Sequence, residues 1–497
     1  MFQLILSVFI VCFISWVYLR WRNVRDYWAR RGVPHLPPHP LMGSLTFLQQ
    51  KNPALWMIDM YKQFNTPYVG IWLFWKPAVI INSPEIAKNI LVKDFSNFRD
   101  RFLKLSSNDP AREMIFTAKH PLWSSIRRNL SSVFTSAKLK SMQTLFDTKI
   151  KELNQRINNT KEKSKINIRM LCTDYSTDVI TAASLGIQTT ATLSGEDPVR
   201  SITKELMDYN WYRGICWSTI FFYPKLANLF RFQFFPTTST KFFDKILQTV
   251  TKQRLREKTN FNESKDLLDA LITLKDGLGN EEEYSDDVVL AQAISFIFGG
   301  FETSGSTLSF ALYELTYHPD IQEKLYRELN EAKKSQNLDI STLHDLKYLN
   351  CIIKETLRKY PPLGWLDRVA VKDYKIDDKL TIPAGTPIYV NAVGMHYDSD
   401  LYPDPETFDP DRFLPDNEKD IKQFTFMPFG EGPRSCIGRR FGEITIRSAL
   451  SSLVLNYKLI PVSGQLTPSE MEYEKRGLIL SPGQILHIDF KQRDLTP

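Results

Sequence analysis

A continuous helical pattern of roughly 32 residues constrains the fold more than any other feature of the sequence. Ser285 is a suitable N-cap, and two aspartates follow it in the first turn, where negative charge favours the helix dipole. The pattern ends at His318 and Pro319. At 1.5 Å per residue such a helix is about 48 Å long, enough to cross an entire globular domain. The chain has no visible internal repeat, so we expect one large, predominantly helical unit rather than several domains.

Three glycines lie within seven residues at the middle of this helix, namely Gly299, Gly300 and Gly305. Each costs about 1 kcal/mol relative to alanine, so the cluster needs a reason. One reason is close packing against another element. The other is a distorted helix that leaves room for a small ligand over a cofactor. Glu302 and Thr303 form an acid–hydroxyl pair in this segment, and Thr303 alone is expected to bond back to the carbonyl of Gly299.

Cys436 lies in a loop that contains three glycines and an arginine, just before an amphipathic run from Arg439 to Leu453. The five cysteines of the chain are scattered, which indicates neither a disulfide framework nor a zinc site. A thiolate that holds haem iron needs nearby cations, backbone donors at a helix start, and glycines that allow close approach of a flat ring. The loop has all three, but alone it leaves haem binding as one of two interpretations, the other being an ordinary reduced cysteine.

The N-terminus predicts a membrane anchor over residues 1–20. Phe2 to Leu19 is almost entirely apolar, and a run of about 18 such residues can span a bilayer. Basic residues follow the run, whereas a cleavable signal peptide has them before it. This asymmetry places the bulk of the chain in the cytosol. Residues 21–40 are expected to form a basic flank and a stiff, proline-rich hinge, and residues 41–497 the catalytic domain.

A carboxylate and a guanidinium lie three residues apart at Glu355 and Arg358, on one face of a predicted helix. The preceding residues are mostly apolar, so we expect this pair to be buried. A buried pair needs further partners to offset desolvation, and Arg412 is the candidate.

Trp123 and Arg127 lie one helical turn apart, and both side chains are donors that can hold one carboxylate. Arg368, after a short apolar stretch, is a further candidate partner for a carboxylate. The net charge of +7 is spread along the chain, which disfavours nucleic-acid binding and favours an acidic protein partner or anionic lipid.

Four motifs occur in one order, and together they resemble those of the cytochromes P450, the haem-thiolate monooxygenases. The motifs are Trp123-x-x-x-Arg127, Gly299-Gly300-x-Glu302-Thr303, Glu355-x-x-Arg358 and Phe429-x-x-Gly432-x-Arg434-x-Cys436-x-Gly438. The resemblance covers essentially the whole chain and is strongest to the microsomal branch abundant in insects, which often oxidises xenobiotics. It implies a mainly α fold with small β-sheets (α+β), preceded by an N-terminal transmembrane helix.

The resemblance also implies roles for individual residues. Cys436 is the expected thiolate ligand of the iron in haem b. The other residues expected at the haem are Trp123, Arg127, Arg368, Phe429, Arg434 and Gly438, of which Trp123 and the arginines would pair with the propionates. Thr303 and Glu302 are expected to relay protons to dioxygen, and Glu355, Arg358 and Arg412 to be structural. His120–Pro121 stands where the family usually has glycine.

The activity implied is insertion of one oxygen atom into a lipophilic substrate, either a xenobiotic such as an insecticide or plant toxin, or an endogenous steroid or fatty acid. No Gly-x-Gly-x-x-Gly fingerprint is present, so we expect electrons from NADPH to arrive through a separate NADPH–cytochrome P450 reductase. Cytochrome b5 is allowed as a second donor. The expected docking face is basic and consists of Arg127, Arg128, Arg439 and Arg440. The expected location is the endoplasmic reticulum membrane, with the catalytic domain on the cytosolic side.

Two alternatives stay open at this stage: a haem-thiolate isomerase or dehydratase that needs no electrons, and a haem-binding carrier or sensor. The aromatic stretch from Trp211 to Phe235 fits either a membrane-dipping access region or ordinary helix packing. Phe116, Phe298 and Phe301 are candidate pocket walls.

Overall fold

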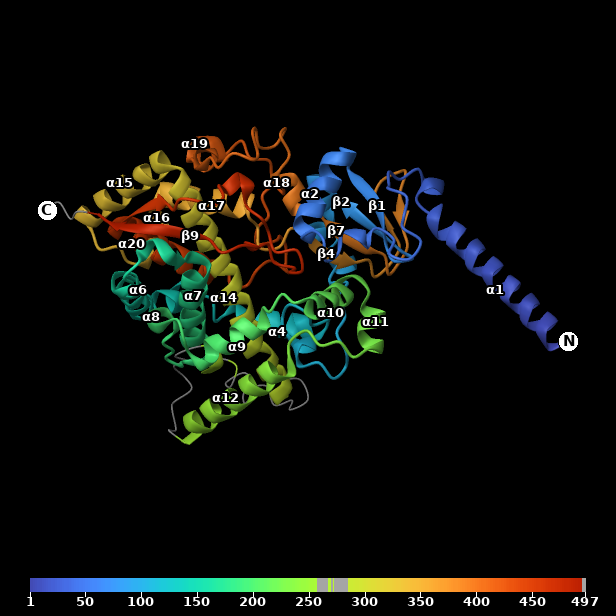
Figure 1. Ribbon diagram of the computed structural model, residues 1–497, viewed down its shortest axis with the longest axis horizontal. Helices are drawn as coiled ribbons and strands as arrows, with labels where there is room; N and C mark the ends of the chain where they lie inside the picture. The colour runs from blue at the N-terminus through green and yellow to red at the C-terminus, as the bar shows by residue number, and fades with distance from the viewer. Residues whose placement is uncertain (257–266, 270, 272–284, 494–497) are drawn as a thin grey trace.

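The computed structural model describes residues 1–256, 267–269, 271 and 285–493. Helix α14 (Asp286–Tyr317) runs through the helical body, and α7 (Ile168–Leu185) packs along it (Figure 1). Ser285 caps α14 by accepting a hydrogen bond from the backbone N–H of Val288, and the helix ends at His318. The helix predicted from the sequence is therefore confirmed at both ends.

The described part of the chain contains further α-helices, most of which belong to the body around α14, while α1 projects from it (Figure 1). In chain order they are α1 (Phe2–Arg25), α2 (Pro53–Phe64), α3 (Pro84–Lys88), α4 (Leu122–Ser131), α5 (Ser136–Lys140), α6 (Gln143–Asn159), α8 (Ala191–Ser194), α9 (Pro198–Leu206), α10 (Trp211–Phe222), α11 (Pro224–Leu229), α12 (Thr237–Arg256), α15 (Pro319–Ser335), α16 (Ile340–Asp345), α17 (Lys347–Lys359), α18 (Ala392–His396), α19 (Pro415–Glu418) and α20 (Arg439–Asn456).

The strands form small sheets beside this body. They are β1 (Tyr68–Leu73), β2 (Lys76–Ile81), β3 (Ile166–Asn167), β4 (Leu366–Val369), β5 (Tyr374–Lys375), β6 (Thr381–Ile382), β7 (Pro387–Val390), β8 (Tyr457–Pro461) and β9 (His487–Gln492). The largest sheet has the order β1-β2-β7-β4, in which β2 and β7 are parallel and the other neighbours antiparallel. The other two have the orders β3-β9-β8 and β5-β6. The expectation of a mainly α fold with small sheets is confirmed.

Helix α1 projects from the body beside the β1–β2 end of the largest sheet (Figure 1). The segment Phe2–Arg31 contains an apolar window of 18 residues and is long enough to cross a membrane, by length and composition. The helix continues through the basic flank to Arg25. Two indoles then fix the following segment to the sheet. Trp28 Nε1 donates to the carbonyl of Ile71 (3.0 Å), and Trp72 Nε1 donates to the carbonyl of Val24 (2.9 Å). The chain between anchor and body is thus packed on β1 rather than free.

The catalytic domain expected over 41–497 contains residues 257–266, 270, 272–284 and 494–497, which lie outside the described residues. Its core joins residues near its start to residues in its second half. Asn52, before α2, donates to the carbonyl of Glu474 (2.8 Å), and Asn391, before α18, donates to the carbonyl of Met57 (2.9 Å). These long-range contacts support a single folded unit.

Candidate active site

The cysteine loop precedes α20 and has a rigid backbone. The N–H of Cys436 donates to the carbonyl of Phe429 (2.8 Å), which closes the loop. Gly430 and Gly432 both have positive φ, at 69° and 74°. A Cβ on Gly432 would lie 2.0 Å from the carbonyl oxygen of Leu91, so only glycine fits there. A Cβ on Gly438 would meet nothing within 4 Å. The loop is therefore tight on one side and open on the side of Gly438.

The Cys436 residue is accessible to solvent, although protein surrounds its sulfur closely enough that burial raises the pKa of its thiol. A backbone N–H at Gly438 and the cations of Arg127 and Arg439 oppose that rise. Arg127 is held against the loop because its Nη1 donates to the carbonyl of Ser435 (2.8 Å). These are surroundings in which a bound metal ion can deprotonate the sulfur.

A cluster of cations lies next to this loop. Its members are Arg101, Lys119, Arg368 on β4 and Arg434. Two carboxylates lie among them: Asp367 binds Arg101 Nη1 (2.8 Å), and Asp100 lies 3.3 Å from Arg434 Nη2. Four cations therefore share two carboxylates. We refer to these three arginines and one lysine as the arginine cluster.

Burial and the neighbouring Arg101 and Arg368 lower the pKa of Arg434 to about 8. Burial likewise lowers the pKa of Arg368 to about 9, and Arg101 contributes to that shift. Among the described residues, the buried Nε atoms of Arg101 and Arg368 have no hydrogen-bond partner. An unpaired buried donor and an excess of positive charge both disfavour the folded chain unless an anion binds there. The two propionates of the haem that the resemblance implies would supply the missing charge.

Trp123 lies on α4 and faces this cluster. Its side chain is buried, and the guanidinium of Arg434 lies 4.2 Å from its ring centre. Pro121 is the residue before α4, so the His120–Pro121 departure leaves the helix intact from Leu122 onward. The structure thus brings Trp123, Arg368 and Arg434 together, and Arg127 of α4 is hydrogen-bonded to the cysteine loop.

The glycines of α14 divide between two faces of the helix. A Cβ on Gly300 would lie 2.4 Å from Ile180, and one on Gly305 would lie 2.7 Å from Thr173, both on α7. A Cβ on Gly299 would meet nothing within 4 Å. Both interpretations of the cluster therefore apply, one to each face: close packing at two glycines and free space at the third. The helix is continuous throughout, so the expected distortion does not interrupt it.

Thr303 and Glu302 have different partners. Thr303 Oγ1 donates to the carbonyl of Gly299 (2.6 Å), as the sequence predicts, and shares the open face of α14 with that glycine. The Glu302 carboxylate is buried and accepts hydrogen bonds from Arg169 Nη2 (2.9 Å) and Ser306 Oγ (3.1 Å). The acid is thus held by α7, and it makes no direct hydrogen bond to Thr303.

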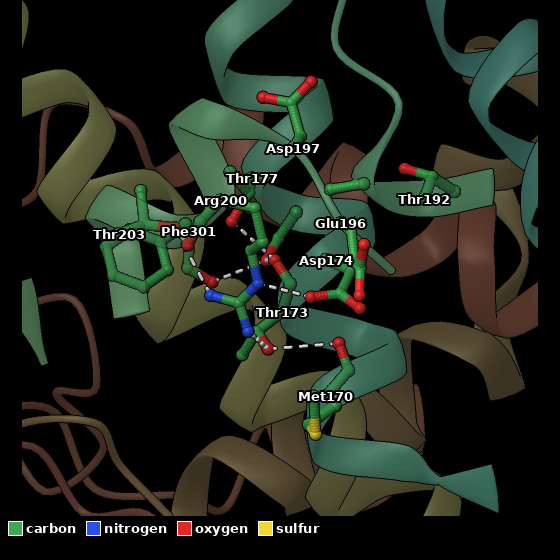
Figure 2. A network of polar contacts seen from close by, with 12 residues as sticks. Met170, Thr173, Asp174, Thr177, Thr192, Glu196, Asp197, Arg200, Thr203 and Phe301 are labelled. Atoms are coloured by element: carbon green, nitrogen blue, oxygen red, sulfur yellow. Dashed lines mark hydrogen bonds and ion pairs between the residues drawn. The ribbon is translucent and has the colours of Figure 1, made fainter. Parts of the chain in front are cut away.

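A polar network connects α7 with α9 and α6 next to the contact between α7 and α14 (Figure 2). Arg200 on α9 forms an ion pair with the buried Asp174 and donates to Thr173 Oγ1 (2.7 Å). Arg156 binds the same carboxylate at 2.7 Å. Phe301 lies beside this network, on the side of α14 opposite Gly299 and Thr303. Its place as a pocket wall is therefore not supported.

The other aromatic candidates do gather. Phe298 packs against Phe234 and Phe235, with ring centres 5.5 and 5.0 Å apart. Phe116 lies 6.3 Å from Phe221 of α10. The stretch from Trp211 to Phe235 is therefore partly core. Its exposed large apolar side chains are Trp211, Tyr212, Ile215, Leu229 and Phe230.

Glu355 and Arg358 form a buried ion pair with two parallel hydrogen bonds, of 2.7 and 2.8 Å. Glu355 also accepts the backbone N–H of Asp409 (2.9 Å) and lies 3.6 Å from Arg412 Nε. Arg358 donates further to the carbonyls of His396 (2.8 Å) and Pro405 (2.9 Å). The third partner expected from the sequence is in place, and the site lies away from solvent.

Three residues of the site were not identified from the sequence: Arg101, Lys119 and Arg169. Arg101 and Asp367 are 266 positions apart, and Arg169 and Glu302 are 133 apart. No local spacing connects such pairs, so only the fold reveals them. The neighbouring charges at Asp100 and Arg101 are the single local signal present.

Comparison with known proteins identifies the family. Residues 33–488 match the family model described as cytochrome P450. Cytochrome P450 6k1 of Blattella germanica is 32% identical over 499 residues, covering 95% of this chain and 94% of the relative. Cytochrome P450 6j1 of the same insect is 33% identical, covering 97% of each chain. Cytochrome P450 6a2 of Drosophila melanogaster is 34% identical over 463 residues, covering 89% of this chain and 90% of the relative.

The chain belongs to the cytochrome P450 family, and it is a haem monooxygenase similar to these insect enzymes. Family membership implies a haem iron held by a thiolate. The donor set fits that cofactor, because the accessible Cys436 lies beside a cluster of four cations that has only two carboxylates.

Proposed function

We propose that this chain is a membrane-anchored monooxygenase of lipophilic compounds that receives its electrons from a separate reductase. The observation that carries the proposal is the position of the Cys436 loop beside the arginine cluster, which has two carboxylates for four cations. Haem b bound through Cys436 provides the anions that the cluster lacks. When bound, a thiolate-ligated haem supplies the activation of dioxygen.

In this proposal the open face of α14 lies over the reacting centre. Thr303 holds its hydroxyl there through the 2.6 Å bond to Gly299 and presents it to incoming water or dioxygen. Glu302 is proposed to relay a proton from solvent to the Thr303 hydroxyl. Its carboxylate is paired with Arg169 and accepts from Ser306, so it must first take up a proton from water. The transfer requires either a bridging water or rotation of the Glu302 side chain away from Arg169. A Thr303→Ala variant is expected to lose coupling between NADPH consumption and product.

Electrons are proposed to enter on the cysteine side from NADPH–cytochrome P450 reductase, with cytochrome b5 as an alternative donor. Arg128, Arg439 and Arg440 are exposed, whereas Arg127 is half-buried against Ser435. The exposed charges can attract an acidic partner. Charge reversal at Arg439 and Arg440 should slow reductase-supported turnover and weaken its salt dependence. Chemical reduction by dithionite is the matched control and should not change. Unchanged reductase-supported turnover and salt dependence would contradict docking at this face.

The proposed location is the endoplasmic reticulum membrane, with the body on its cytosolic side. Helices α10 and α11 lie on the side of the body from which α1 projects (Figure 1), and they expose Trp211, Tyr212 and Leu229. These side chains can dip into the lipid interface and admit lipophilic substrates. The proposed substrates are xenobiotics such as insecticides or plant toxins, or an endogenous steroid or fatty acid.

The experiment that tests the function is a product screen of the protein reconstituted with reductase and NADPH in lipid vesicles. Each lipophilic class is supplied with and without NADPH. Oxygenated product that depends on NADPH supports the proposal. Product without NADPH would indicate the isomerase or dehydratase, and tight haem binding with no product from any class would indicate a carrier or sensor.

A further inference from the structure

His396, the last residue of α18, is wholly buried between two parts of the site. Its Nδ1 lies 3.0 Å from the carbonyl oxygen of Arg358, and its Nε2 lies 3.1 Å from the backbone nitrogen of Met427. Arg358 in turn donates from Nη1 to the carbonyl of His396 (2.8 Å). One imidazole therefore connects α17 with the segment that leads into the cysteine loop.

The two partners determine the tautomer of His396. The backbone N–H of Met427 can only donate, so Nε2 must offer its lone pair. The carbonyl of Arg358 can only accept, so Nδ1 must carry the proton. A second proton on the ring would face the N–H of Met427 with another donor. Burial and the nearby Arg358 guanidinium also lower the pKa of His396 to about 3, so the ring stays neutral across the physiological range.

The segment held by His396 is the start of the cysteine loop. Met427 is buried, and its carbonyl accepts the N–H of Gly430 (3.0 Å). Two residues after Met427, the carbonyl of Phe429 accepts the N–H of Cys436 (2.8 Å). A displacement of Met427 would therefore move the acceptor that fixes the backbone of Cys436.

We propose that His396 is a positioning residue for Cys436: it transmits the rigid geometry of the Glu355–Arg358 pair to the cysteine loop through two directed hydrogen bonds. The ion pair fixes Arg358, the imidazole spans from Arg358 to Met427, and Met427 opens the loop that presents the sulfur. This inference rests on the assignment of Cys436 as the haem ligand, and the experiment below separates the failure of one from that of the other.

Two matched variants each break one of the two bonds. His396→Gln can place its amide oxygen near the position of Nε2, which keeps the acceptor for Met427 and loses the donor to Arg358. His396→Asn can place its amide nitrogen near the position of Nδ1, which keeps the donor to Arg358 and leaves the N–H of Met427 unpaired. Both substitutions are neutral and polar, so they differ mainly in which link survives.

The measurement is the carbon monoxide difference spectrum of the reduced holoprotein, recorded beside haem content and thermal unfolding. We expect His396→Asn to raise the ratio of thiol-type to thiolate-type spectrum by about tenfold, as a buried unpaired N–H displaces the loop. We expect His396→Gln to keep that ratio within about threefold of the wild type. A threefold change in an equilibrium corresponds to only a small free-energy difference. Haem content normalises the spectra, and the melting temperatures show whether each variant folds.

Equal spectral ratios in the two variants would overturn the proposal, whether both are shifted or both are like the wild type. The hydrogen bond to Met427 would then have no specific effect on the cysteine loop. If neither variant folds with haem, His396→Gln has failed to rescue the link, and the proposal is also overturned. A wild-type protein without the thiolate-type spectrum would instead overturn the haem-ligand assignment of Cys436.

Discussion

Two groups of buried arginines in this protein differ in how their charge is balanced. At the Glu355 site, Arg358 makes two hydrogen bonds to the carboxylate and further ones to backbone carbonyls. In the arginine cluster, burial is the main cause that lowers the pKa of Arg368 and of Arg434, and the neighbouring Arg101 lowers both further. At the Glu355 site a carboxylate of the chain balances Arg358, although the buried Nε of Arg412 makes no hydrogen bond among the described residues. The arginine cluster has two carboxylates for four cations, and we infer that it needs negative charge from a ligand.

The comparison shows how a structural charge can be told from a ligand-binding one. Removing one partner of a paired buried charge destabilises the fold, because the other charge is then left buried without compensation. A buried charge with too few partners lowers the stability of the fold, and an anion that binds to it raises that stability. The four predictions below test that difference, from the largest expected effect to the smallest.

Replacing Glu355 with glutamine should destabilise the protein by about 3–5 kcal/mol, because Arg358 would keep a buried charge without its carboxylate. The measurement is chemical unfolding of the purified protein, together with haem content. Lys324→Met is the matched control, since its pair with Asp411 is about half-exposed and should contribute less than about 1 kcal/mol. Equal losses in the two variants would contradict the assignment of Glu355 to a buried structural pair.

Replacing Arg412 with methionine should have a smaller effect, of about 2 kcal/mol, since its Nε lies 3.6 Å from Glu355 and the main pair remains. Unfolding and haem content are again the measurements. A loss as large as that of the Glu355 variant would mean that Arg412, not Arg358, is the principal partner.

Replacing Arg368 with methionine should leave the haem-free protein as stable as before, or slightly more so, since its lowered pKa reports an unfavourable buried charge. The haem should dissociate about tenfold faster, as measured by transfer to a haem-scavenging protein. The opposite signs of these effects distinguish the cluster from the Glu355 site. A destabilised apoprotein with unchanged haem loss would contradict a propionate role for Arg368.

Lys119 should make the stability of the haem-free protein depend on pH. Burial lowers the pKa of Lys119 from 10.5 to about 8 in the folded chain. Between pH 8 and 10.5 the unfolded chain therefore binds more protons, so the free energy of unfolding should rise with pH in that window. Below pH 8 Lys119 contributes no slope. Lys119→Met should reduce the slope, and an identical slope in both proteins would show that other groups cause it.

The sequence predicted those parts of the site whose geometry is local. Ser285 and His318 delimit α14 as expected, and helical spacing brings Glu355 next to Arg358. The sequence did not reveal contacts made between distant segments. Arg169 reaches Glu302 only because α7 packs along α14 at two glycines, and His396 meets Met427 only through the fold.

The glycines of α14 show the limit most clearly. Their composition indicated either packing or free space, and a sequence pattern cannot tell which side of a helix faces which neighbour. The structure assigns Gly300 and Gly305 to packing and Gly299 to free space. Phe301 was misplaced for the same reason, because its face depends on the position of α7.

The central claim is that Cys436 holds the haem iron as a thiolate, and the carbon monoxide difference spectrum of the reduced protein tests it most directly. The wild type should give the thiolate-type spectrum, and Cys436→Ala should lose it entirely. The Cys351→Ala variant should keep it, because Cys351 is buried elsewhere in the fold. Among the described residues, its thiol donates a hydrogen bond only to the carbonyl of Phe413. A thiolate-type spectrum retained by Cys436→Ala would contradict the account.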